Sequence, residues 1–203
     1  MSQVLLASRN RKKLGELQRV VDAAGLTGLE VIGLDAVPEY PEEPETGATF
    51  EDNALIKARA GAKATGLPCL ADDSGIEIDA LNGMPGVLSA RWSGVHGDDA
   101  ANNALVLAQL SDTPDDRRGA AFVSACALVS PAGDETVVRG EWRGTFAREP
   151  QGSNGFGYDP LFLPDDAVAA GRSAAELAPA EKDALSHRGK ALAQLVPALR
   201  ALA

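Results

Sequence analysis

Apolar residues change their spacing along the chain, and these changes predict its elements. Residues 3–7 (QVLLA) read as a short strand, and apolar positions at three- and four-residue spacing then predict a helix from Leu14 to Ala24, closed by Gly25. A second helix is expected to begin after Thr49, because Thr49 and Asp52 fit a capping box. Residues 69–71 read as a buried strand, which the residues 72–75 (DDSG) are expected to end.

The second half of the chain predicts a loop, a helix, two strands and a final helix. The loop covers residues 89–99, and the helix lies around residues 100–110. Residues 117–131 and 136–148 read as strands joined by a turn at 131–134. A leucine stripe then indicates a C-terminal helix with Ser186 as its N-cap, and His187 and Arg188 are expected in an exposed first turn. This order of elements predicts a mixed α/β protein.

Composition fits one folded domain over residues 1–203. Of the 203 residues 45% are hydrophobic and 24% are charged, so the chain can bury a core and could carry two lobes. No apolar run approaches 18 residues, and the N-terminus does not read as a signal peptide, so we expect no membrane association. Cys69 and Cys126 lie in apolar runs, which favours buried reduced thiols and a cytoplasmic location over a single disulfide.

Basic residues gather near the N-terminus of an otherwise acidic chain. The net charge of −10 and the pI near 4.7 argue against nucleic-acid binding. Arg9, Arg11, Lys12 and Lys13 nevertheless lie at the predicted strand-to-helix junction, where the helix dipole disfavours cations. A phosphate would resolve this conflict, and the short polar side chains flanking Arg9 could cap the helix or bind phosphate oxygens. These two residues are Ser8 and Asn10. The alternative is a solvated helix start.

Two acids suggest a metal site. Glu45 lies in an acidic, proline-rich loop, and Asp73 follows Asp72 at the predicted strand end. Neighbouring residues of an extended chain point to opposite faces, so one carboxylate can face a cleft while the other satisfies the backbone. Mg²⁺ is typically held by one or two carboxylates together with phosphate oxygens and water, which suits the pair Glu45 and Asp73. The alternatives are a solvated Glu45 and an Asx-turn at Asp73.

The sequence SNGFGYDPLF (residues 153–162) puts aromatic side chains on a flexible backbone. Glycines allow a backbone to approach a flat ligand, and an aromatic face can stack on a purine. Asp159 could accept a hydrogen bond from a ring N–H or a sugar hydroxyl, or orient a basic partner. A plain turn would not need Phe156 and Tyr158.

Five motifs together resemble the inosine triphosphate pyrophosphatase family along essentially the whole chain. They are Ser8-x-Asn10-x-x-Lys13, Thr46-Gly47-x-Thr49-Phe50 with Asn53-Ala54 and Lys57-Ala58, Ala71-Asp72-Asp73-Ser74-Gly75, Gly155-Phe156-Gly157-Tyr158-Asp159-Pro160, and Glu181-Lys182 with Ser186-His187-Arg188-Gly189. The resemblance implies an α/β fold with a mixed, twisted central sheet, flanking helices and two lobes with an active-site cleft between them. It also implies a homodimer and Mg²⁺-dependent hydrolysis of ITP, dITP and XTP to the monophosphate and pyrophosphate, which removes deaminated purines from the nucleotide pool.

The resemblance also implies roles for particular residues. Residues 8–13 and Lys57 would bind the triphosphate, Glu45 and Asp73 would bind the metal, and Asp73 would also act as the acid–base residue for water. Ser74 would contact the substrate. Base and sugar would be framed by Phe156, Gly157, Tyr158, Asp159, Lys182, His187 and Arg188. Lys12 stands where the family usually has glycine, which leaves the backbone of this loop to be determined.

Two other functions remain possible on the sequence alone. A non-catalytic nucleotide sensor could use the same phosphate loop and base pocket. A pyrophosphatase of modified pyrimidine or standard nucleotides would need similar residues.

A donor at Arg188 or His187 would complement the O6 atom of hypoxanthine or xanthine and would oppose the amino group of adenine. We therefore expect ITP and XTP to be preferred over ATP.

Overall fold

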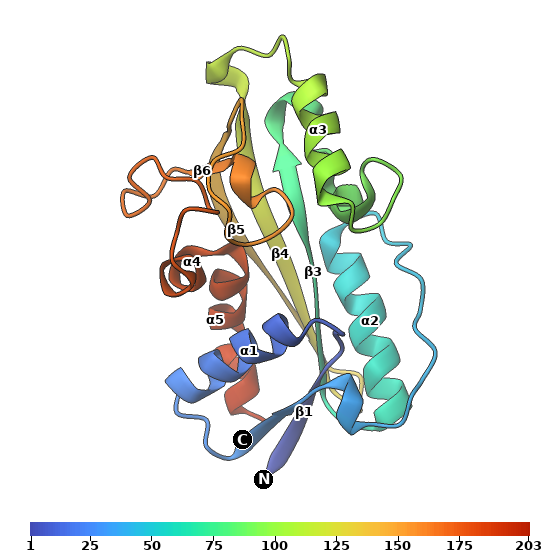
Figure 1. Cartoon of the computed structure of the whole chain (residues 1–203). Coiled ribbons are helices and arrows are strands. Elements are labelled where there is room, and N and C mark those ends of the chain that lie inside the picture. The colour runs from blue at the N-terminus through green and yellow to red at the C-terminus, as the bar shows by residue number, and fades with distance from the viewer. The chain divides into compact units, whose positions relative to one another are not determined.

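The computed structural model describes the backbone of residues 1–203 and every side chain except that of Asp183. Helices and strands alternate along the first half of the chain (Figure 1). In chain order the elements are β1 (Ser2–Leu6), α1 (Arg11–Ala23), β2 (Leu29–Ile32), α2 (Phe50–Thr65), β3 (Cys69–Ile78), α3 (Asp99–Gln109), β4 (Gly119–Val129), β5 (Glu135–Phe146), β6 (Phe162–Pro164), α4 (Pro179–Leu185) and α5 (His187–Arg200).

The strands form one mixed sheet in the order β2-β1-β3-β4-β5-β6. Strand β1 pairs in parallel with both β2 and β3, whereas β5 and β6 are antiparallel. Because parallel neighbours need a crossover, the helices α1 and α2 connect the first three strands. The turn expected between β4 and β5 is present, with the amide of Ser130 donating to the carbonyl of Asp134. The expected mixed α/β fold is confirmed.

Strand β3 does not end at residues 72–75, so both the predicted strand end and the Asx-turn are wrong. The strand continues to Ile78, since Ile76 and Ile78 are fully buried and anchor its second half. Gly75 lies against the hydroxyl of Ser89 and the carbonyl of Gly86, where a larger residue would have no space. Small, turn-forming residues therefore serve close packing within a strand here.

Two other expected elements also differ. The loop expected over residues 89–99 begins inside a short 3₁₀ helix, Gly86–Arg91. The C-terminal stretch forms two helices, because Ser186 takes an extended backbone conformation between α4 and α5. The start of the last helix after Ser186 agrees with the prediction, but α4 was not predicted.

The chain divides into two compact units, each with its own apolar core. The first unit comprises Met1–Asp73, Ser124–Gly140 and Arg188–Ala203, and the second comprises Ser74–Val123 and Glu141–His187. In the first unit, α1 and α5 pack their apolar faces, Leu17 and Leu195 among them, on β1, β3 and β4. In the second, Trp142, Phe146 and Phe162 are fully buried at the centre of the core. The cleft expected between two lobes stays a prediction.

The two cysteines agree with the expectation of reduced thiols. Cys69 and Cys126 are both free and buried, and burial raises the pKa of each thiol to about 12. Among the described residues, no helix combines the length and the apolar character that a membrane crossing requires.

Candidate active site

The basic segment lies at the start of α1, as predicted. Asn10 is the N-cap, and its side chain accepts a hydrogen bond from the amide of Lys12 at 2.9 Å. The hydroxyl of Ser8 in turn accepts from the amide of Asn10 at 3.2 Å. The first turn contains no acid, so the positive end of the helix dipole is reinforced by basic side chains. Lys12 itself has an ordinary helical position, and a glycine conformation is not required there.

The basic side chains of this segment point to two different surroundings. Ser8, Arg9 and Arg11 line a cavity of about 690 Å³ together with residues from the segment 33–42. Arg9 also forms an exposed ion pair with Glu42 at 2.5 Å. Lys13 is half-buried and instead contacts Asp72, with its Nζ atom 2.8 Å from Oδ2. The cluster is therefore divided, and Lys13 joins the carboxylates of β3.

Asp72 is the centre of a buried ion-pair network. Its side chain, only 3% exposed, contacts Lys13 at 2.8 Å and the Nε atom of Arg188 at 3.1 Å. Arg188 also contacts Glu16 of α1 at 3.2 Å, which links three segments of the first unit. Burial by itself raises the pKa of Asp72, but the charges of Lys13 and Arg188 outweigh burial and lower the pKa. Asp72 thus neutralises two cationic side chains rather than satisfying backbone, contrary to the sequence-based expectation.

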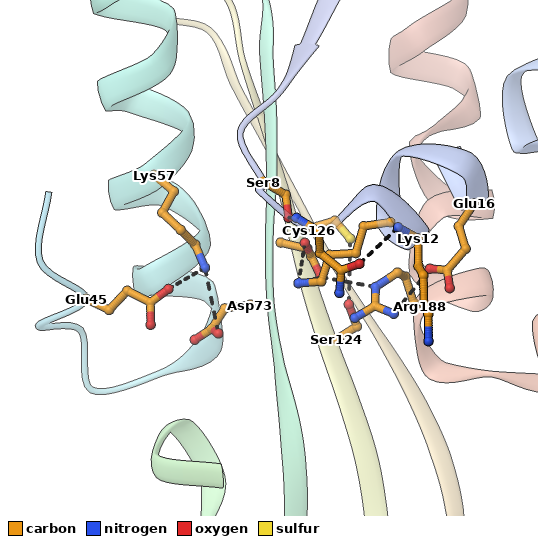
Figure 2. A network of polar contacts seen from close by, with 12 residues as sticks. Ser8, Lys12, Glu16, Glu45, Lys57, Asp73, Ser124, Cys126 and Arg188 are labelled. Atoms are coloured by element: carbon orange, nitrogen blue, oxygen red, sulfur yellow. Dashed lines mark hydrogen bonds and ion pairs between the residues drawn. The ribbon is translucent and has the colours of Figure 1, made fainter. Parts of the chain in front are cut away.

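Asp73 faces a separate group of residues, as alternation along a strand requires. Asn53 of α2 donates from its Nδ2 atom to Asp73 at 2.9 Å, and the Nζ atom of Lys57 lies 3.8 Å from the Asp73 carboxylate. The same Nζ atom lies 2.6 Å from Glu45 (Figure 2). Burial raises the pKa of Asp73, and the nearby charges of Glu45 and Asp72 add to this effect. A carboxylate with a raised pKa is suited to accept a proton.

Glu45 and Asp73 are suited to a divalent cation. Their two carboxylates converge on one ammonium group, that of Lys57, so the site already stabilises positive charge between them. Among the described residues no group of three or more His, Cys, Asp or Glu side chains could hold a metal. Two carboxylates supplemented by phosphate oxygens and water are typical of Mg²⁺ sites. The donor set therefore fits Mg²⁺ bound together with a phosphorylated ligand.

In the second unit, Asp159 organises the segment Gly155–Asp159. Its carboxylate accepts from the amide of Phe156 at 2.8 Å and contacts the Nζ atom of Lys182 at 2.5 Å. That Nζ atom also lies 5.3 Å from the centroid of the Phe156 ring. Of the roles considered for Asp159, the structure therefore favours orientation of a basic partner. Phe156 is still 52% exposed, so its ring is accessible to a flat ligand.

Tyr158 has a structural position. Its side chain is buried, and its hydroxyl donates to the carbonyl of Ser89 at 2.8 Å. Burial raises the pKa of the phenol, so the hydroxyl stays protonated as this donor. Ser74 is half-buried in β3.

His187 and Arg188 are not exposed, so the predicted exposed helix mouth is wrong. His187 is buried with its ring stacked on Phe122 at 5.1 Å between centroids, and Arg188 is 7% exposed. Arg188 is charged although it is buried, because Asp72 and Glu16 hold it. Burial lowers its pKa, but the two carboxylates raise the pKa further. A helix start can thus lie inside the protein when carboxylates from other elements compensate its charge.

Sequence reasoning missed several residues that organise these groups. Glu16 reads as an ordinary surface acid of α1 because its partner Arg188 is 172 positions away. Asn53 belongs to the quoted motifs but had no assigned role, although it is buried and bonds both Asp73 and the amide of Gly47. A buried asparagine on the alanine face of a predicted helix was the available signal.

Comparison with known proteins agrees with the resemblance noted in the sequence. The model of the Ham1 family matches residues 4–198. A protein of Nocardia farcinica named dITP/XTP pyrophosphatase is 70% identical over 203 residues, covering 100% of this chain and 97% of that protein.

Solved structures show the same fold. A crystal structure titled nucleoside-triphosphatase / dITP/XTP pyrophosphatase from Mycobacterium abscessus is 68% identical, with a TM-score of 0.82, and the match covers 97% of this chain and 99% of that one. A HAM1 protein from Coxiella burnetii is 44% identical with a TM-score of 0.86, covering 98% of both chains.

Proposed function

The chain belongs to the Ham1 family, and on this premise we propose that it hydrolyses deaminated purine nucleoside triphosphates to the monophosphate and pyrophosphate. Relatives at 70% identity carry the name dITP/XTP pyrophosphatase, which supports a hydrolase acting on dITP and XTP. We extend the substrates to ITP, which shares its base with dITP. The observation that carries the proposal is that the carboxylates of Glu45 and Asp73 converge on the ammonium group of Lys57. Asp73 lies on β3 directly after Asp72, which forms an ion pair with Lys13.

The chemistry assigned to the first unit is hydrolysis at the α-phosphorus. Water attacks this phosphorus, the bond to the bridging oxygen of the β-phosphate breaks, and pyrophosphate leaves. Asp73 accepts the proton of the water, because burial raises its pKa and Asn53 fixes its orientation. Mg²⁺ held by Glu45 and Asp73 would supply charge stabilisation to the phosphate oxygens. Lys13, Lys57 and the start of α1 bind the triphosphate, with Ser8, Asn10 and the arginines contributing contacts.

The second unit is assigned to the base and sugar. The exposed ring of Phe156 stacks on the purine, and Lys182 and Asp159 fix that ring. By the resemblance, Ser74, Gly157, Tyr158 and His187 of this unit also belong to the substrate site, as does Arg188 of the first unit. The guanidinium of Arg188 already binds the carboxylates of Glu16 and Asp72. To recognise the O6 atom of the base, it would have to donate a further hydrogen bond while keeping these contacts. A lysine would keep the charge at this position but not the planar fork.

A substrate panel with Mg²⁺ tests the proposal. Wild-type protein is incubated with ITP, dITP, XTP, GTP, ATP and a modified pyrimidine triphosphate, and pyrophosphate and orthophosphate are measured separately. We expect pyrophosphate as the phosphorus product, with kcat/KM highest for ITP, dITP and XTP and reduced when Mg²⁺ is removed. Arg188→Lys should lower the ITP/ATP ratio if Arg188 reads O6.

The panel also separates the rival functions. A nucleotide that stays bound and intact over hours with Mg²⁺ would identify a sensor. Preferential hydrolysis of ATP or of pyrimidine nucleotides would reject the base selectivity. We further propose that the protein is a homodimer in the cytoplasm, and light scattering after gel filtration tests its mass.

A further inference from the structure

Helix α3 holds the backbone of the proposed base-binding segment through two side chains. The amide of Gly157 donates to Oδ2 of Asp99 at 2.7 Å. The carbonyl of the same residue accepts from Nδ2 of Asn103 at 2.9 Å. Residues four apart lie on one face of a helix, so Asp99 and Asn103 can form hydrogen bonds to both the amide and the carbonyl of Gly157. Gly157 has a φ of +62°, a conformation that its neighbours must hold.

The sequence of this helix start, DDAANN (residues 98–103), separates the contacts to Gly157 from structural ones. Asp98 is the N-cap of α3 and accepts from the amide of Ala101 at 3.0 Å. Asn102 is buried: it donates to the carbonyl of Ala90 in the 3₁₀ helix at 3.3 Å and accepts from the amide of Ser93, just after that helix, at 2.7 Å. Each pair of identical residues thus has one member that supports the helix or its neighbouring loop and one that contacts Gly157.

Asn103 carries one polar atom that takes no part in its contact to Gly157. Its Oδ1 atom is buried and has no hydrogen-bond partner among the described residues. A buried acceptor without a partner costs free energy, which offsets part of what the bond from Nδ2 to Gly157 contributes. Core stability therefore does not explain an asparagine here, whereas its bond to Gly157 does.

We propose that Asp99 and Asn103 are positioning residues that fix the Phe156 ring for the base. The backbone on both sides of this ring is held: the Phe156 amide by Asp159, and both groups of Gly157 by α3. The ring itself stays exposed. The backbone of this segment is therefore held in place, while the side chain remains accessible. A ligand that stacks on a preorganised ring does not lose affinity in ordering the loop. This inference rests on the proposed function, since it assigns the base to Phe156.

Binding of two separate probes to the full chain tests the proposal. Inosine monophosphate carries the base and sugar, and inorganic pyrophosphate reports only on phosphate recognition. Asp99→Ala should weaken binding of inosine monophosphate about tenfold or more, while pyrophosphate binding changes less than about twofold. Asp99→Asn keeps an acceptor oxygen and should restore most of the affinity. Asp98→Ala is the matched control, because it removes an adjacent carboxylate that only caps the helix.

Asn103→Leu separates positioning from folding. This variant removes both the unpartnered oxygen and the bond to Gly157, two effects of opposite sign, so its melting temperature should stay close to that of the wild type, yet it should bind inosine monophosphate more weakly. Asn102→Ala should do the reverse, lowering the melting temperature with little effect on relative affinity for the two probes. Asp99→Ala and Asn103→Leu proteins that bind inosine monophosphate like the wild type would overturn the proposal. Parallel losses for both probes would overturn it as well.

Amide hydrogen exchange distinguishes failure of this proposal from failure of the proposed function. Exchange of the Gly157 amide needs no ligand, and it should be at least about tenfold faster in Asp99→Ala than in wild type or Asp98→Ala. If the wild type binds neither probe, the proposed function fails while the exchange rates still report whether α3 holds the segment. Equal exchange rates in all three proteins would show that Asp99 does not hold Gly157.

Discussion

The acidic site of the first unit and the aromatic segment of the second are organised by different interactions. Around Asp72 and Asp73, charged side chains compensate one another: Lys13 and Arg188 on one face of β3, Lys57 on the other. Around Phe156, side chains instead form hydrogen bonds to backbone groups. Among the interactions described for that segment, one is an ion pair, between Asp159 and Lys182. Charge balance therefore governs the first region, and backbone positioning governs the second.

This difference follows from what each region is proposed to bind. A triphosphate brings several negative charges and a metal, so its site needs cations and carboxylates whose charges are balanced before it binds. A purine is uncharged and flat, so its site needs one well-placed ring. Apart from Arg188, which is also proposed to contact the base, substitutions in the first region should change stability, pH dependence and turnover, whereas those in the second should change base affinity.

The largest expected effect is on stability, from Asp72→Ala. The buried Arg188 has two described carboxylate partners, and this substitution removes Asp72 and leaves Glu16. The free energy of unfolding should therefore fall by about 3 kcal/mol or more. Asp79→Ala is the control, because its ion pair with Arg143 is about half exposed and should be worth less than about 1 kcal/mol. Urea denaturation measures both. Equal losses in the two variants would contradict the role of the buried network.

Asp73→Asn should affect turnover rather than stability. The amide keeps the shape of the side chain but removes the charge and the proton acceptor, so kcat with ITP and Mg²⁺ should fall at least about 100-fold. The melting temperature should change by only a few degrees. Asp116→Asn, which alters an exposed carboxylate, should leave kcat unchanged. Turnover close to that of the wild type at saturating Mg²⁺ would contradict the assignment of Asp73 as the proton acceptor.

Phe156→Ala tests the aromatic segment of the second unit. Removing the ring should weaken binding of inosine monophosphate by about 1–3 kcal/mol, the usual value for stacking of a base on an aromatic side chain. Pyrophosphate binding should not change, because the ring contacts no phosphate in this proposal. Val168→Ala, another exposed apolar position, serves as the control, and calorimetry measures both probes. A matching loss of pyrophosphate affinity would indicate that the two regions do not divide the ligand as proposed.

The smallest effect is a change in acid sensitivity. The pKa of Asp72 is lowered in the folded protein, so its ion pairs contribute full stability above the unfolded value near 3.9 and lose it as pH falls further. Between pH 5 and pH 3, wild type should therefore lose at least about 1 kcal/mol more than Asp72→Asn. The raised pKa of Asp73 acts in the opposite direction, but it is present in both proteins and largely cancels. Parallel curves would exclude this contribution.

The sequence by itself determined those features that depend on local interactions. The capping box of α2 and the turn before β5 involve residues at most four apart, and both were predicted correctly. Of the two residues considered as caps for α1, the structure selects Asn10. The opposite orientations of Asp72 and Asp73 follow likewise from the geometry of any strand. The motif resemblance also indicated the family, because it depends on the order and spacing of residues rather than on their contacts.

Only the tertiary structure decided what these residues contact. Nothing local indicates that Glu16 meets Arg188, that Asn53 holds Asp73, or that α3 grips Gly157, since these partners lie 20 to 172 positions apart. The continuation of β3 through DDSG and the burial of Arg188 were missed for the same reason. Turn propensity and charge favour exposure at such residues, but packing against Ser89 and pairing with distant carboxylates supply more free energy than those local preferences.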